Sequence, residues 1–77
     1  MKLVNLNVGD SACIKKIGGN NHLAIHLMEM GLVRYTKIKV IKNINNKELI
    51  VIKYRGEVMS ITNDIASIIE VYDSSNR

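Results

Sequence analysis

The segment His22–Leu32, HLAIHLMEMGL, carries the strongest local structural signal of the sequence. Its apolar residues recur with the i, i+4, i+7 spacing of one helix face: Leu23, Leu27 and Met30. Gly31 stands where a residue of left-handed conformation ends a helix, and Leu32 can fold back onto the last turn as in a Schellman motif. The segment therefore predicts a helix from about Asn21 to Met30 that stops at Gly31.

The same segment also carries three potential metal ligands. His22 and His26 are four residues apart and Glu29 is three further, so all three can share one helix face, a spacing from which Zn(II) or Fe(II) could take two nitrogens and an oxygen. The polar face of any amphipathic helix produces the same spacing, and no further His or Cys is spaced to complete a site, apart from Cys13. We therefore favour a solvated helix face over a metal site and expect no bound cofactor.

Short apolar runs separated by turn residues flank the helix. Residues 11–17 predict a strand, which Gly18-Gly19-Asn20-Asn21 ends. A meander of three strands is predicted at residues 36–44, 49–52 and 57–61, with turns at 45–46 and at 55–56. The continuous β-branched run at 49–52 is typical of a strand covered on both faces. Thr62 is a candidate N-cap for a helical turn through residue 66 or 67, before a last strand at 68–71.

These elements predict a mainly β fold. About five short strands, one inserted helix and a helical turn before the last strand fit one small barrel, because closure removes exposed strand edges. The 77 residues are expected to form a single domain, residues 1–77, with a frayed tail at about 73–77. A chain this short buries a modest core, so a binding surface is expected rather than a substrate cleft.

Composition narrows the classes of function. No nucleophile, base and orienting group are arranged as in an enzyme, and Cys13 reads as a half-buried strand residue, so we expect no catalytic activity. The formal charge of +4 favours acidic partners: nucleic acid, an anionic membrane face or an acidic protein. The three tyrosines that could stack on bases fall on separate elements: Tyr35, Tyr54 and Tyr72. A nucleic-acid-binding module is therefore an alternative that we do not favour.

Other features point to the cytoplasm. A single cysteine excludes an internal disulfide and fits a reducing compartment. The sequence shows no signal-peptide pattern and no apolar run that approaches the roughly 20 residues of a membrane span.

In order and spacing, the sequence resembles the FeoA family, the small cytosolic proteins of bacterial ferrous-iron uptake. The most specific match is the helix end at residues 26–32, HLMEMGL, and the others are residues 6–9, 14–18, 38–40, 55–61 and 66–71. Members often carry a Pro and a Gly where this chain has Arg34 and Tyr35. A turn of type I geometry is permitted for this Arg-Tyr pair.

The resemblance implies an SH3-like β-barrel with an inserted helix and a role beside FeoB, the membrane ferrous-iron transporter with a cytosolic GTPase domain. We expect docking on that domain, at the inner face of the bacterial membrane, through a groove between helix and barrel. The residues expected to border this groove are Leu27, Met30, Leu32 and Tyr35, while Gly31 and Gly56 are expected to be a structural cap and turn. FeoA-like domains also occur in metal-dependent repressors, so a homo-oligomeric metal-sensing module remains the other alternative.

Overall fold

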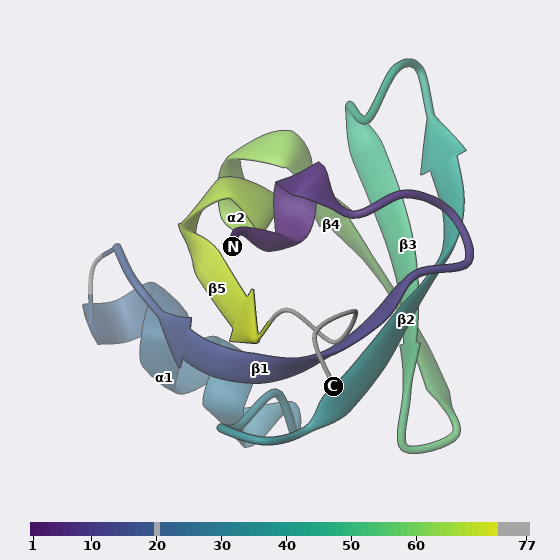
Figure 1. Ribbon diagram of the computed structural model, residues 1–77. Coiled ribbons are helices and arrows are strands. Elements are labelled where there is room, and N and C mark those ends of the chain that lie inside the picture. Colours follow the sequence, from purple (N-terminus) through teal and green to yellow (C-terminus); the bar gives the residue numbers. More distant parts are fainter. Residues whose placement is uncertain (20, 73–77) are drawn as a thin grey trace.

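One antiparallel sheet and two α-helices make up the fold. The computed structural model describes residues 1–19 and 21–72. The elements in chain order are η1 (Leu3–Asn5), β1 (Ser11–Ile17), α1 (Asn21–Glu29), β2 (Lys37–Ile44), β3 (Leu49–Tyr54), β4 (Glu57–Thr62), α2 (Asn63–Ile68) and β5 (Ile69–Tyr72), as Figure 1 shows. The 3-10 turn η1 was not predicted from the sequence.

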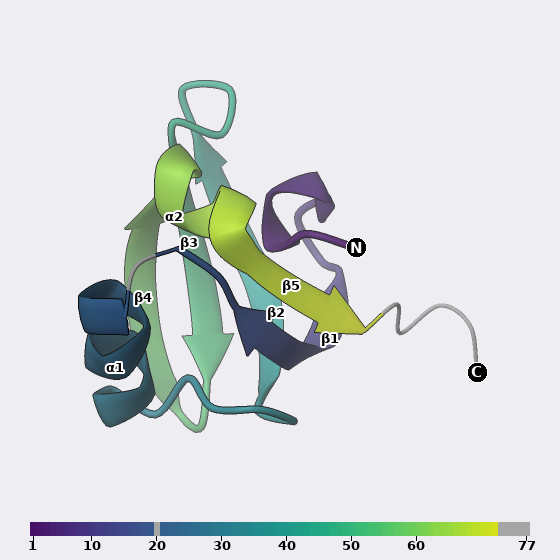
Figure 2. The same cartoon turned by 90° about the vertical axis from the view of Figure 1, so that its left-hand side faces the viewer.

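The five strands lie in the order β4-β3-β2-β1-β5, and every neighbouring pair is antiparallel. The sheet curls into a partly open barrel whose edge strands are β4 and β5. In Figure 2, α1 lies below α2, and α2 contacts β3, β4 and β5 on the open side of the sheet. This arrangement confirms the mainly β class with one inserted helix and a short helix before the last strand.

Strand alternation builds the core. The inward side chains of β1, β2, β3 and β5 are buried, and Tyr54 on β3 is 6% exposed. The others are at most 1% exposed: Ala12, Ile14, Ile38, Val40, Ile50, Ile52, Ile69 and Val71. Strand β3 alternates as well, because Leu49 and Val51 are only half-buried. The expectation that β3 is covered equally on both faces is therefore wrong, and its outer face is accessible to solvent.

The two predicted hairpin turns differ in length. Arg55 (φ +50°) and Gly56 (φ +77°) form the predicted two-residue turn, with both residues in the left-handed region that a type I′ turn requires. The turn between β2 and β3 is longer than predicted, because Lys47 (φ +74°) follows Asn45 and Asn46 in the same region. Lys47 also donates a 2.9 Å hydrogen bond from Nζ to the Val4 carbonyl, which ties this hairpin to η1.

The helix before the last strand and the two ends of the chain differ in detail from the prediction. Thr62 stands at the N-cap of α2 with an extended backbone, but its side chain makes no capping hydrogen bond. Ile68 is the last residue of α2 rather than the first of the final strand. The Val71 amide donates to the Met1 carbonyl over 2.7 Å, so the N-terminal residue lies along the free edge of β5. The tail expected at residues 73–77 lies outside the described residues.

Candidate docking site

Helix α1 ends in a complete Schellman motif. The Leu32 amide donates to the Leu27 carbonyl and the Gly31 amide donates to the Met28 carbonyl, each over 3.0 Å. Gly31 has a φ of +100°, which is costly for any residue with a Cβ. The two leucines are the hydrophobic pair of the motif, and both are buried in the core. The predicted cap at Gly31 is therefore confirmed.

The barrel holds this helix end in place. The Tyr54 hydroxyl on β3 donates a 2.9 Å hydrogen bond to the Met30 carbonyl, and the Thr36 hydroxyl donates a 3.2 Å hydrogen bond to the Gly31 carbonyl. A Cβ on Gly31 would lie 3.4 Å from the Tyr54 ring. The C-terminal end of α1 is thus fixed to the sheet by side chains from β3 and from the residue just before β2.

The structure divides the four residues predicted to border the docking groove. Leu27 is 3% exposed and Leu32 is 0% exposed, so these two belong to the core and a partner cannot reach them. Met30 is 46% exposed and Tyr35 is 65% exposed, so these two remain available. The predicted helix through Met30, with Met30 on the same apolar face as Leu27, is wrong at its end, because α1 stops at Glu29 and Met30 is exposed.

A groove between helix and barrel lies beside Met30. It has a volume of about 500 Å³ and is lined by Glu29, Met30, Gly31, Tyr54, Arg55 and Glu57. Carboxylates and a guanidinium both line it, so its charge is mixed. A groove is thus present where the sequence predicted one, although Met30 is the only one of the four predicted residues that lines it.

Tyr35 lies on the other side of the helix end, in the loop before β2. Its φ of +74° excludes the type I turn that the sequence permitted. Its ring stacks on that of Tyr72 with centroids 5.8 Å apart and planes 8° from parallel. The Arg34 guanidinium lies 5.1 Å from the Tyr35 centroid, and the Lys15 ammonium lies 5.7 Å from the Tyr72 centroid. We call Lys15, Arg34, Tyr35 and Tyr72 the tyrosine cluster.

Arg34 is the electrostatic centre of the tyrosine cluster. Its guanidinium donates two hydrogen bonds to the Tyr72 hydroxyl, from Nε over 3.3 Å and from Nη2 over 2.9 Å. The Arg34 hydrogen bond lowers the pKa of Tyr72 below its usual value, since it favours the phenolate.

The potential metal ligands do not converge. His22, His26 and Glu29 are all exposed on α1. Within residues 1–19 and 21–72, no three side chains of His, Cys, Asp or Glu are grouped so that they could hold a metal ion. Cys13 is half-buried in β1, between Lys37 on β2 and Tyr72 on β5.

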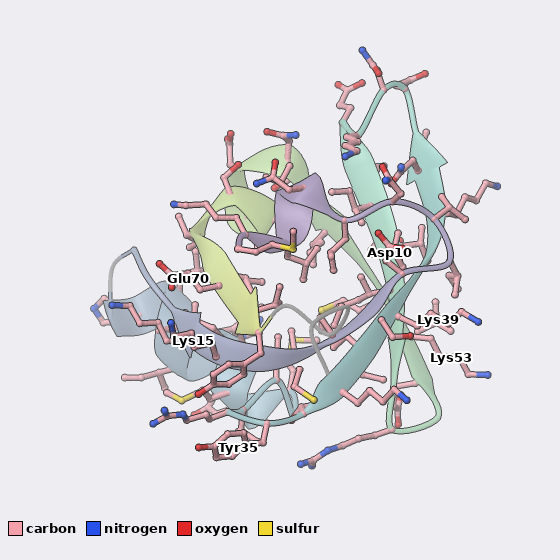
Figure 3. The ribbon with its side chains drawn as sticks, in the orientation of Figure 1. Asp10, Lys15, Tyr35, Lys39, Lys53 and Glu70 are labelled. Atoms are coloured by element: carbon pink, nitrogen blue, oxygen red, sulfur yellow. The ribbon has the colours of Figure 1, made fainter. Side chains whose placement is uncertain are left out.

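A basic face covers the outside of β2 and β3. Lys39 and Lys53 are directly opposite in the strand register, and both project away from the sheet on the side opposite Lys15 and Tyr35 (Figure 3). A shallow pocket of about 390 Å³ beside them is also lined by Lys37 and Arg55. Like charges directly opposite each other destabilise a sheet, so this face adds nothing to folding.

The tyrosine cluster was not found from the sequence. Tyr35 and Tyr72 are 37 positions apart in the sequence, and they meet because the Tyr35 loop and β5 both hydrogen-bond to β1. The sequence signal that could have indicated it is the Arg-Tyr pair at residues 34–35, in the loop that follows the cap at Gly31. In the described part of the chain, no helix is long and apolar enough to cross a bilayer.

Comparison with known proteins places the fold. The family model described as "FeoA domain" matches residues 1–73. The FeoA protein from Chlorobium tepidum is 29% identical with a TM-score of 0.87, over 94% of this chain and 69% of that one. The iron(II) transport protein A from Clostridium thermocellum is 28% identical with a TM-score of 0.87, over 97% of this chain and 46% of that one.

A more distant structure supports the fold alone. The zinc-complexed FeoA of Stenotrophomonas maltophilia, described as an SH3 domain protein, is 19% identical with a TM-score of 0.82, over 97% of this chain and 92% of that one. These likenesses confirm the predicted SH3-like fold. A search of curated proteins gave no match.

Proposed function

Because the chain belongs to the FeoA family, which is associated with ferrous-iron transport, we propose that it is a cytoplasmic accessory protein that docks on the GTPase region of a FeoB transporter. The action is binding rather than catalysis. Binding at that region would place the protein at the inner face of the membrane, where a charge of +4 is favourable beside anionic lipids.

One observation carries this proposal. Half of the large hydrophobic side chains that are exposed in the described chain lie on α1 and the loop after it: Ile25, Met28, Met30 and Tyr35. Exposed apolar residues gathered on one element mark an interaction surface more often than the same residues scattered singly. Methionine suits such a surface, because its flexible thioether adapts to the shape of a partner.

The proposal is tested by calorimetry of the full chain with the soluble GTPase region of the transporter. Met30→Glu places a charge at the exposed edge of the groove beside Tyr54, and we expect the affinity to fall at least about tenfold, because a buried unpaired charge at an interface is costly. Leu27→Asp is not suitable, since Leu27 is buried and its replacement would unfold the protein.

Val8→Glu is the matched control. Val8 is 54% exposed and lies in the loop before β1 rather than on α1. Its replacement by glutamate introduces the same negative charge as Met30→Glu. Binding that survives Val8→Glu and is lost with Met30→Glu supports docking through α1. No binding of the wild-type chain to the GTPase region, or equal loss in both variants, overturns the proposal.

A further inference from the structure

A second groove runs between α1 and β1, on the side of the helix end that carries Arg34. Ile17, Ala24 and Met28 supply the accessible apolar floor, and Met28 at its edge is 45% exposed. Ile14 and Leu32 lie beneath this floor and are buried. The volume is about 200 Å³. Small-molecule sites are usually larger, about 300–1,000 Å³, so this groove has the size to receive a side chain rather than a cofactor.

Cations surround this apolar floor. Lys15 and Lys16 on β1 and Arg34 in the loop line the groove, and no carboxylate is among its lining residues. None of the three cations forms an ion pair with a described residue. The groove therefore joins an aliphatic floor to three positive charges, and Glu70, which lies opposite Lys16 in the strand register, forms no ion pair with any of them.

Arg34 is already held in position. Its two hydrogen bonds to the Tyr72 hydroxyl and its contact with the Tyr35 ring fix a side chain that would otherwise be mobile. A guanidinium has five N–H donors, so donors remain for a carboxylate. Fixing the arginine beforehand reduces the entropy that a ligand must overcome.

Tyr35 takes a costly backbone conformation to complete this arrangement. The left-handed backbone conformation costs a residue that has a Cβ about 1–2 kcal/mol of conformational energy. Its side chain is 65% exposed, so core packing does not explain why a large residue is kept there. Strained residues gather at ligand-binding positions, where the surrounding structure holds them.

We propose that this groove binds an acidic segment of a partner protein, with one aliphatic side chain of the segment against Ile17, Ala24 and Met28 and a neighbouring carboxylate on Arg34 and Lys15. The inference rests on the proposed function only for the existence of a protein partner. Charge complementarity selects an acidic segment, and the aliphatic floor selects a peptide over a nucleic acid. A nucleobase gains little here, because Tyr35 and Tyr72 already cover a face of each other's ring.

The test uses the full chain and a short synthetic peptide with one leucine flanked on both sides by glutamates. We expect amide resonances of Lys15, Met28 and Arg34 to shift on titration, with a Kd on the order of 100 μM. Replacing the leucine of the peptide with serine, or its glutamates with glutamines, should weaken binding about tenfold or more. An unchanged Kd with either altered peptide contradicts the proposal.

Variants of the protein distinguish specific binding in this groove from general attraction between a basic protein and an acidic peptide. Arg34→Gln and Met28→Asp should each weaken binding about tenfold, because one removes the carboxylate partner and the other places an acid at the groove edge. Lys39→Gln is the control: it removes one positive charge from the opposite side of the molecule (Figure 3) and should leave the Kd unchanged. Equal weakening by Lys39→Gln and Arg34→Gln overturns the proposal.

The outcomes distinguish this inference from the proposed function. Peptide binding without binding to the transporter's GTPase region leaves the inference standing and removes the proposed partner. Binding to the GTPase region without peptide binding removes the inference alone. Tighter binding of a mixed-sequence single-stranded oligonucleotide than of the peptide, with shifts at the same residues, replaces the inference with a nucleic-acid site.

Discussion

The Tyr54 hydroxyl on β3 donates a 2.9 Å hydrogen bond to the carbonyl of Met30, the residue that follows α1. Tyr54 is 6% exposed, so this bond joins a core side chain to the end of the helix that bears the exposed apolar residues. The helix position therefore depends on a residue that lies in the barrel.

Tyr54→Phe is expected to lower the free energy of unfolding by about 1 kcal/mol, the usual net value of a neutral hydrogen bond. The ring remains, so packing of the core is preserved. Urea unfolding measures the change. An unchanged free energy of unfolding would show that water replaces the hydroxyl at the Met30 carbonyl without loss.

Gly31→Ala is expected to destabilise the protein more than Gly56→Ala. Both glycines have a positive φ, so each replacement costs about 1 kcal/mol or more in backbone energy. A Cβ at Gly31 also meets the Tyr54 ring at 3.4 Å, whereas a Cβ at Gly56 meets nothing within 4 Å. Urea unfolding of both variants under the same conditions compares their free energies of unfolding. An equal loss of free energy would show that the Tyr54 ring moves aside at no cost.

Leu32→Ala and Met30→Ala separate the core from the surface of the helix end. Leu32 is fully buried, so its truncation is expected to cost about 2–5 kcal/mol. Met30 is nearly half exposed, and its truncation is expected to change the free energy of unfolding by less than about 0.5 kcal/mol. Thermal or urea unfolding checks both values, and comparable losses would contradict the division of these residues.

The Tyr72 hydroxyl is expected to titrate below the pH at which an exposed tyrosine ionises. Its folded pKa is lowered by Arg34, so the unfolded chain binds more protons in the interval below the usual tyrosine pKa of about 10. The resulting stabilisation is fully present above about pH 10 and is lost as the pH falls through the folded pKa of Tyr72. Ultraviolet titration of the phenolate measures the pKa, and Arg34→Gln should raise it toward the usual value.

Tyr35→Gly is expected to stabilise the fold when the stacked partner is absent. In a Tyr72→Ala background, glycine removes the strain of the left-handed conformation, and we expect a gain of about 1 kcal/mol. With Tyr72 present, the same change also loses an aromatic pair worth about 0.5–1.5 kcal/mol, so the gain should shrink or vanish. Urea unfolding of the four proteins of this cycle tests both statements, and a loss in the Tyr72→Ala background contradicts the strain.

Local signals in the sequence predicted most of the elements. The strand at Ser11–Ile17 and the helix end at Gly31 follow from neighbouring residues, because alternation and capping act over a few positions. Burial around the helix end was predicted less well. Helical periodicity predicted that Leu27 and Met30 lie on the same apolar helix face. The helix ends between them, however, and only Leu27 is buried against the barrel.

The tyrosine cluster shows what periodicity cannot predict. The stack of Tyr35 on Tyr72 depends on a pairing between strands that are far apart in the chain, and on a backbone conformation that tyrosine rarely adopts. Neither condition leaves a repeated pattern in the sequence. The partner-binding role of Met30 and Tyr35 remains a prediction.

The firmer attachment of α1 at its C-terminal end has a consequence for how tightly any partner can bind. Its C-terminal turn is fixed by Gly31, Leu32 and Tyr54. Near its start, Leu23 packs half-buried against the core, while His22 and Ile25 are exposed. The first turns of α1 are therefore expected to open, and to exchange their amide hydrogens, well before the sheet does. A partner held between α1 and β1 binds only molecules whose helix is seated, so its apparent affinity scales with that fraction. Core residues such as Tyr54, which hold the end of α1 in place, would then tune recognition.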